Sequence, residues 1–206
     1  MTEKQKKKIF SSFDEKKAFK QLKITKLSRW DIESQPVQPS EFFHQRLARL
    51  TSRFNLKNSE KAKELLIDAI CEEGLEGFNN LIFWKGAALE SDELTGNVDY
   101  LLTENKDYLE APFLCVVEAK KDDFEKGLAQ CMVEMQACQC NNQKFGKNID
   151  IFGIVTNGEG WKFYQLTVAG MVYETLLYSI SNLSAILGIL HDLFQQCESA
   201  IRPQEE

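Results

Sequence analysis

Three charged residues have the types and spacing needed for chemistry on phosphate esters. Asp99 lies in the segment Asn97–Thr103. Glu118 and Lys120 close the segment Phe113–Lys120, where strand alternation puts both side chains on one face. If the two segments pair as a hairpin across the polar connection between them, Asp99 falls opposite Glu118. Two adjacent carboxylates repel unless a cation lies between them, and Mg²⁺ or Mn²⁺ prefers such oxygen ligands. A neighbouring lysine adds positive charge where phosphate oxygens gain negative charge during hydrolysis.

A simpler interpretation stays open, in which Glu118 and Lys120 form an edge-strand ion pair that faces water and contributes little stability. The run Phe113–Val117 is continuously apolar, which is typical of a central strand buried on both faces. Functional sites on α/β sheets gather where such strands end. The position of the two charges directly after this run therefore favours a functional site.

Composition restricts the class of protein. The chain has 206 residues and a net charge of −6, and runs such as Phe113–Val117 are far shorter than the ~20 residues that cross a bilayer. No apolar segment follows the charged start, so we expect a cytoplasmic protein without a membrane partner. The six cysteines form no CxxC pair and there are two histidines, which argues against a disulfide framework, a zinc site or a histidine base.

The charge is unevenly distributed. Residues 1–29 carry ten lysines and arginines against three acids, and the rest of the chain carries 15 against 28. Residues 1–39 are therefore predicted to form a basic N-terminal extension that is partly packed, and residues 40–206 to form the main domain. The basic arm is either a phosphate-binding element or a solvated tail.

Hydrophobic periodicity predicts a mixed architecture. Helices are expected over residues 40–54, 58–74 and 123–143 and from 182 onward. Strands are expected over 81–89, 97–103, 113–120, 149–156, 161–167 and 171–179. This order predicts an α/β fold, bordering on α+β, with a central mixed β-sheet flanked by helices.

Two segments carry a resemblance to a known family. Gly96-Asn97-Val98-Asp99-Tyr100 followed by Val117-Glu118-Ala119-Lys120 resembles the signature of the PD-(D/E)XK nuclease superfamily, and more narrowly that of the nuclease domain of type I restriction enzyme motor subunits. Two flanking stretches agree with that pattern. They are 58–68, which is similar to the family's first helix, and 154–164, which is similar to its Thr-Asn-Gly turn and following strand.

The resemblance implies a restriction-endonuclease-like fold and a set of site residues. Asp99 and Glu118 would bind Mg²⁺ (or Mn²⁺) with the help of the Ala119 carbonyl. Lys120 would orient or deprotonate the attacking water. Two further roles are implied with their alternatives: an accessory acid at Glu60, or at its rival Glu64, and a supporting or DNA-contacting glutamine at Gln130. Exposed helix faces explain Glu60, Glu64 and Gln130 equally well.

The chain departs from the family pattern at two positions. Val98 stands where a proline is common, and Glu134 stands where related domains have a tyrosine. Four lysines near the expected helix, Lys121, Lys126, Lys144 and Lys147, either line a phosphate groove or form a solvated face. No ATP-binding Gly-x-x-x-x-Gly-Lys-Ser/Thr motif is present, so any motor is expected on a separate chain.

The resemblance therefore predicts Mg²⁺-dependent hydrolysis of phosphodiester bonds in DNA, in restriction, repair or defence. The expected partners are DNA and a separate motor or specificity subunit, and an oligomer is compatible with the sequence. The main alternative is a catalytically silent nuclease-fold module that acts as a DNA-binding or assembly subunit. A plain structural protein, in which the three charges form a surface network, is a further alternative.

Overall fold

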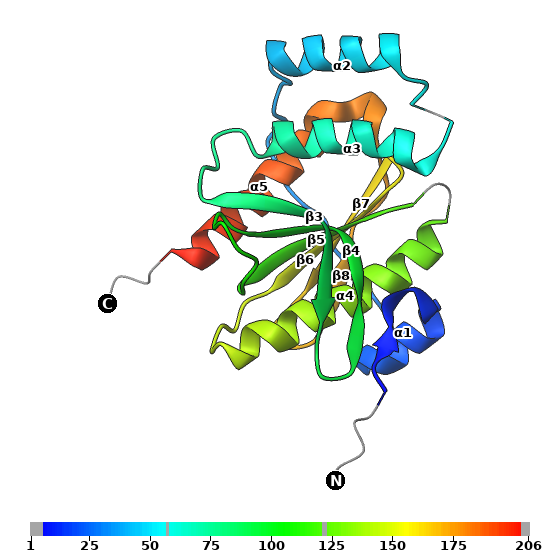
Figure 1. Ribbon diagram of the computed structural model, residues 1–206, viewed down its shortest axis with the longest axis vertical. Helices are drawn as coiled ribbons and strands as arrows, with labels where there is room; N and C mark the ends of the chain where they lie inside the picture. The colour runs from blue at the N-terminus through cyan, green and yellow to red at the C-terminus, as the bar shows by residue number, and fades with distance from the viewer. Residues whose placement is uncertain (1–5, 57, 121–122, 203–206) are drawn as a thin grey trace.

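The protein folds around a nine-stranded mixed sheet, as the computed structural model in Figure 1 shows. The structure describes residues 6–56, 58–120 and 123–202. The helices are α1 (Glu15–Leu22), α2 (Glu41–Arg53), α3 (Glu60–Gly74), α4 (Phe124–Lys144) and α5 (Leu183–Ile201). The strands are β1 (Lys8–Ile9), β2 (Ser28–Arg29), β3 (Leu81–Glu90), β4 (Leu94–Glu104), β5 (Phe113–Ala119), β6 (Ile151–Thr156), β7 (Gly160–Leu166), β8 (Val172–Glu174) and β9 (Tyr178–Ser179).

Three of the helices begin where the sequence predicted. The side chains of Ser40, Ser59 and Asp123 each accept a hydrogen bond from a backbone N–H in the first turn of α2, α3 and α4, respectively. These bonds satisfy one of the N–H groups that a helix leaves without an internal partner. Short polar side chains therefore set the starts of the helices that flank the candidate site.

The centre of the sheet is formed by β4, β5, β6 and β7. Strand β5 pairs antiparallel with β4 and parallel with β6, and β6 pairs antiparallel with β7. Residues 114–119 of β5 are buried, which confirms the prediction of a central strand. The segment 171–179, expected as one strand, instead forms β8 and β9, which pair with opposite ends of β7 and leave Leu176 and Leu177 exposed between them.

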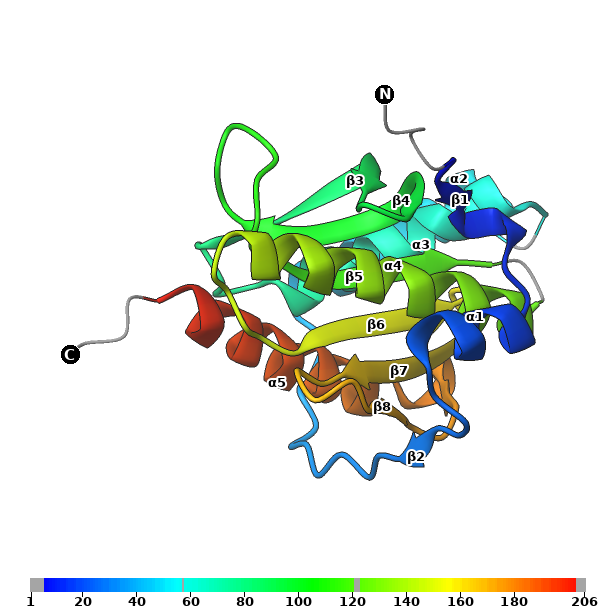
Figure 2. The same ribbon diagram turned by 90° about the horizontal axis from the view of Figure 1, so that it is seen from below.

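Helices cover both faces of this sheet, so the predicted mixed α/β architecture is confirmed (Figure 2). On one face α3 and α5 pack on the strands through residues such as Ile67, Leu102 and Phe194, with α2 outside them. On the other face α4 and α1 bury residues such as Val116 and Met132. In the described part of the chain, no helix is long and apolar enough to cross a membrane.

The N-terminal arm is built into the same sheet. Strand β1 pairs parallel with β4, and β2 pairs parallel with β8 at the opposite edge. Phe10 is buried, and Trp30 stacks on Phe152 with ring centroids 6.1 Å apart. The N-terminal arm and residues 40–206 therefore do not form separate structural units, because strands of both belong to one sheet and share its core.

Candidate active site

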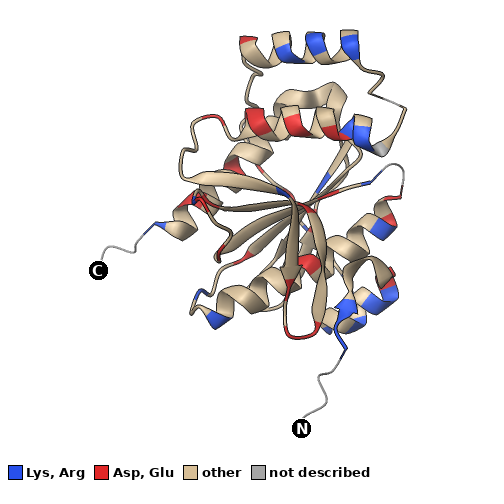
Figure 3. Cartoon of the chain, viewed as in Figure 1, with Lys and Arg blue, Asp and Glu red and all other residues tan. Residues whose placement is uncertain are grey.

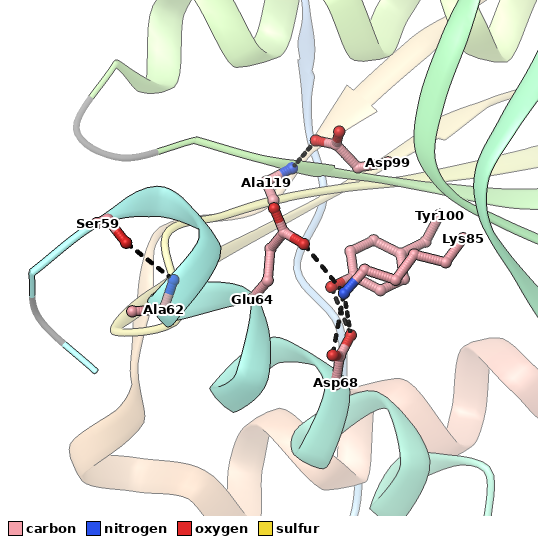
Figure 4. Close-up of polar contacts among 8 residues, drawn as sticks. All are labelled: Ser59, Ala62, Glu64, Asp68, Lys85, Asp99, Tyr100 and Ala119. Carbon is pink, nitrogen blue, oxygen red and sulfur yellow. Dashed lines mark hydrogen bonds and ion pairs between the residues drawn. The ribbon is translucent and has the colours of Figure 1, made fainter. Parts of the chain in front are cut away.

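Strand pairing brings Asp99 and Glu118 next to each other. The pairing of β4 with β5 ends at Tyr100 and Val117, and one residue further out on each strand are Asp99 and Glu118. The backbone N–H of Ala119 donates a hydrogen bond to Asp99 Oδ2 at 2.8 Å, which ties the two strands together at this point (Figure 4). The register expected from the sequence is therefore confirmed.

One edge of β4 is left without strand pairing around Asp99. On the side of β4 that faces β5, β1 pairs with β4 as far as Thr95, and β5 begins to pair at Tyr100. Asp99 thus lies on this edge of β4 between the residues that pair with β1 and those that pair with β5. This interval leaves the Asp99 side chain partly exposed although its neighbours Val98 and Tyr100 are buried.

Lys120 covers Glu118. The Glu118 side chain is 0% exposed and forms an ion pair with the Lys120 ammonium, whose side chain is 19% exposed. The backbone N–H of Lys120 donates to the Thr156 carbonyl at 2.9 Å, so β6 holds the end of β5 in place. Apart from the Lys120 ion pair, neither carboxylate oxygen of Glu118 accepts a hydrogen bond from the described residues. The buried Glu118 thus has a partly exposed lysine as its ion-pair partner.

The pKa of Glu118 reflects this burial. Burial first, and next the negative charge of Asp99, raise the pKa of Glu118, whereas Lys120 lowers it, and together they bring it to about 7. Near neutral pH the carboxyl therefore lies between its two protonation states. A cation that binds between Asp99 and Glu118 would favour the ionised form.

A second buried carboxylate, Glu134, lies beside Glu118. Gln130 donates a hydrogen bond from Nε2 to Glu134 Oε1 at 2.9 Å, and both side chains come from α4. Glu134 is 0% exposed, and its Oε2 has no hydrogen-bond partner in the described part of the chain. Burial, and next the charge of Glu118, raise the pKa of Glu134 well above its ordinary value.

Gln130 is therefore not an exposed helix residue. It is 8% exposed and donates a hydrogen bond to the buried Glu134, so the alternative of a solvated glutamine is wrong. Glu134, noted from the sequence only as a departure from the family, lies on the buried face of α4. A signal was present, because Glu134 follows Cys131 by three residues and precedes Cys138 by four, which places an acid inside the apolar stripe.

On the opposite face of the sheet, α3 supplies two acids to one lysine. Lys85 Nζ lies 3.0 Å from Glu64 and 2.9 Å from Asp68, and the Tyr100 hydroxyl donates to Asp68 at 2.7 Å (Figure 4). Glu64 is thus an acid of α3 that reaches the sheet. Glu60 is the first residue of α3, and its side chain lies outside what the structure describes. The spacing of Glu64 and Asp68, four residues apart on one helix face, was the available signal for this cluster.

The remaining sequence candidates lie away from this end of the sheet or inside the core. Lys144 is in the last turn of α4, about 27 Å along the helix from Lys126, and pairs with Asp92. Lys147 lies just beyond the same end of α4. Lys121 lies outside the described residues. Buried aromatic side chains, such as Trp161, form part of the core.

The donor set fits a hard divalent cation. Asp99, Glu118 and the Ala119 carbonyl offer oxygen ligands, and Mg²⁺ is held by one or two carboxylates with water completing its shell. The described residues contain no cluster of three or more histidine, cysteine or acidic side chains placed to hold a metal. The buried oxygens of Glu118, which lack hydrogen bonds, are consistent with a cation ligand once Lys120 moves aside.

Comparison with known proteins identifies no relative. No protein-family model matches the chain, and no curated protein shows a significant match to it. The assignment to the PD-(D/E)XK superfamily therefore stays a prediction from the sequence motifs.

Proposed function

We propose that this protein is a Mg²⁺-dependent nuclease that hydrolyses phosphodiester bonds in DNA, in restriction, repair or defence. The proposal rests on one observation: Asp99, Glu118 and Lys120 lie together where the pairing of β4 with β5 ends. Two carboxylates and an ammonium group on adjacent strands are suited to bind a cation and a phosphate together.

Each of the three residues has a role that its surroundings support. Asp99 and Glu118, with the Ala119 carbonyl, would hold Mg²⁺, which supplies charge that polarises a phosphoryl oxygen and lowers the pKa of water. Lys120, released from Glu118, would orient the attacking water or take its proton, and would offset negative charge on the phosphate oxygens. Gln130 fixes Glu134 next to Glu118 and so limits the movement of that carboxylate.

One observation favours a second candidate function. Glu118 is fully buried beneath Lys120, and a second buried acid lies next to it. A site that is closed in this way is also compatible with a catalytically silent nuclease-fold module that binds DNA or assembles with a separate motor or specificity subunit. Such a module would retain DNA without turnover.

Cleavage of plasmid DNA by the purified protein separates the two functions. We expect nicking in Mg²⁺, none in EDTA, and a loss of about 100-fold or more in Glu118→Gln and Lys120→Gln, because both remove charge that acts in the transition state. Lys147→Gln, which removes an exposed lysine beyond the far end of α4, is the matched control and should cleave normally. Urea unfolding verifies that each variant is folded.

Equal cleavage by Lys120→Gln and the unchanged protein would contradict the enzyme proposal. Salt-sensitive DNA binding without any Mg²⁺-dependent turnover would favour the silent module instead.

A further inference from the structure

The N-terminal arm forms a groove at the same end of the sheet. Helix α1 lies beside the first half of α4 (Figure 2). A groove of about 770 Å³ lies between the start of α1 and the start of α4. Basic residues from both helices line it, namely Lys16, Lys17, Lys20 and Lys126. The arm and the main part of the chain therefore build this surface together.

The groove leads to the candidate active site. Asp123, which lines the groove, follows Lys120 by three residues, so at most about 11 Å of extended chain separates them. The Lys120 side chain also lies against the first turn of α4, because a Cβ added at Gly127 would lie 3.0 Å from Lys120 Cγ. Lys126 is the residue directly before Gly127. A polymer in the groove would thus pass close to Lys120.

The charges of the N-terminal arm favour a polyanion, because residues 1–29 carry ten lysines and arginines against three acids. Lys16, Lys20 and Lys126 are exposed, and among the described residues none of them forms an ion pair. Figure 3 shows the basic residues of α1 on the same side of the molecule as the start of α4. The arm thus gathers positive charge on a chain whose net charge is −6. Such a local basic surface attracts phosphate groups.

Four acids also line the groove and equal its four lysines in number, so the excess of positive charge comes from the rest of the arm. Asp14 accepts the Lys17 backbone N–H at 2.8 Å and pairs with the Lys17 ammonium at 3.1 Å. Asp123 accepts the Lys126 backbone N–H at 2.9 Å, as the cap of α4. The remaining two, Glu15 and Glu125, are exposed. Exposed Lys23 and Lys26 then continue the basic surface beyond α1.

We propose that the groove between α1 and α4 binds the phosphate backbone of DNA and guides it to Asp99, Glu118 and Lys120. The inference rests on the proposed function for its choice of DNA as the polyanion. Lysine contacts to phosphates do not depend on base sequence, so this surface would supply affinity and position rather than sequence preference.

Salt-dependent DNA binding tests the groove separately from catalysis. The full chain is titrated against a fluorescent DNA duplex in EDTA, which prevents cleavage, over a series of NaCl concentrations. The triple variant Lys16→Gln, Lys20→Gln and Lys126→Gln should bind about tenfold or more weakly at 0.1 M salt. Its slope of log K against log salt should be smaller by about 3, since each lost phosphate contact removes about 1.

A second triple variant is the matched control. Lys106→Gln, Lys144→Gln and Lys147→Gln remove the same charge from the end of the molecule away from Asp99 and should leave affinity and slope close to those of the unchanged protein. Equal loss in both triple variants would overturn the groove proposal, because a general charge effect would then explain the binding.

The outcomes also separate this inference from the proposed nuclease activity. If the unchanged protein binds DNA but the groove variant binds equally well, the groove proposal is wrong and the nuclease proposal stands. If the groove variant binds weakly and no protein cleaves in Mg²⁺, the groove is supported and the enzyme proposal fails. If the unchanged protein does not bind DNA, both fail.

Discussion

Glu134 occupies a place where a carboxylate is costly. Its side chain is fully buried and one of its oxygens has no partner among the described residues, so ionisation would leave a charge without solvation. The folded protein therefore retains a proton on this group at a pH where the unfolded chain has lost it. For an acid with a raised pKa, stability falls as the pH rises above the ordinary pKa near 4.5.

Glu134→Gln should therefore stabilise the metal-free protein at pH 8 and change it little at pH 5. Glutamine keeps an oxygen that accepts the Gln130 hydrogen bond and has no proton to lose. We expect a gain of about 1–3 kcal/mol in the free energy of unfolding at pH 8, measured by urea denaturation.

Glu198→Gln is the control for this change. Glu198 is also largely buried, but Asn80 donates to it at 3.1 Å and Arg202 pairs with it at 2.7 Å. Removal of its charge should bring no gain at pH 8. A Glu134→Gln protein that is no more stable than the unchanged protein at pH 8 would show that Glu134 is not held in its protonated form.

At the scale of elements, Gly127 allows α4 to lie close to the strand ends. A Cβ at this position would lie 2.7 Å from Val155 Cγ1 on β6 and 3.0 Å from Lys120 Cγ. Real Cβ atoms essentially never approach another atom as closely as 2.7 Å, so either the helix or Val155 must shift, and Lys120 must give way by a few tenths of an ångström. The absence of a side chain at Gly127 thus sets the position of Lys120 over Glu118.

Gly127→Ala should cost about 1–3 kcal/mol of stability, the usual range for overpacking, and should lower the cleavage rate by displacing Lys120. Urea denaturation and the plasmid assay measure the two effects. Gln143→Ala, an exposed position near the other end of α4, should leave both nearly unchanged. Equal stability of Gly127→Ala and the unchanged protein would mean that the contact relaxes without cost.

The elements differ in how well the sequence predicted them. Helices α2 to α5 and strands β3 to β7 agree with their periodicity, because each buries a repeating apolar face. The arm strands β1 and β2 were not predicted. Each has two residues, and each exists only because it pairs with a strand far away in the sequence, β1 with Leu94 and Thr95 and β2 with Tyr173 and Glu174.

At the scale of the whole molecule, the arm spans the sheet from one edge to the other. Phe10 packs so closely on β4 that a Cβ added at Gly96 would lie 2.5 Å from its ring. At the other edge the arm crosses α5, where a Cβ added at Gly188 would lie 2.3 Å from the Gln35 carbonyl oxygen. The arm therefore contributes to the stability of the entire fold.

Phe10→Ala should cost about 3–5 kcal/mol of unfolding free energy, as expected for the loss of a buried aromatic side chain. The preceding residue supplies the control, because Ile9 is 54% exposed whereas Phe10 is 1% exposed. Ile9→Ala should change stability by well under 1 kcal/mol. Similar values for the two variants in urea denaturation would indicate that the arm packs only loosely on the domain.

The sequence by itself determined the mixed architecture and the meeting of Asp99 with Glu118. Both depend on local information, namely the apolar periodicity of each segment and the register of one hairpin. The tertiary structure alone decided that Lys120 pairs with buried Glu118, that Gln130 donates to Glu134 beside it, and that α1 forms a groove with α4. These features depend on which residues meet after distant segments pack, and a pattern along one segment carries no information about its partners.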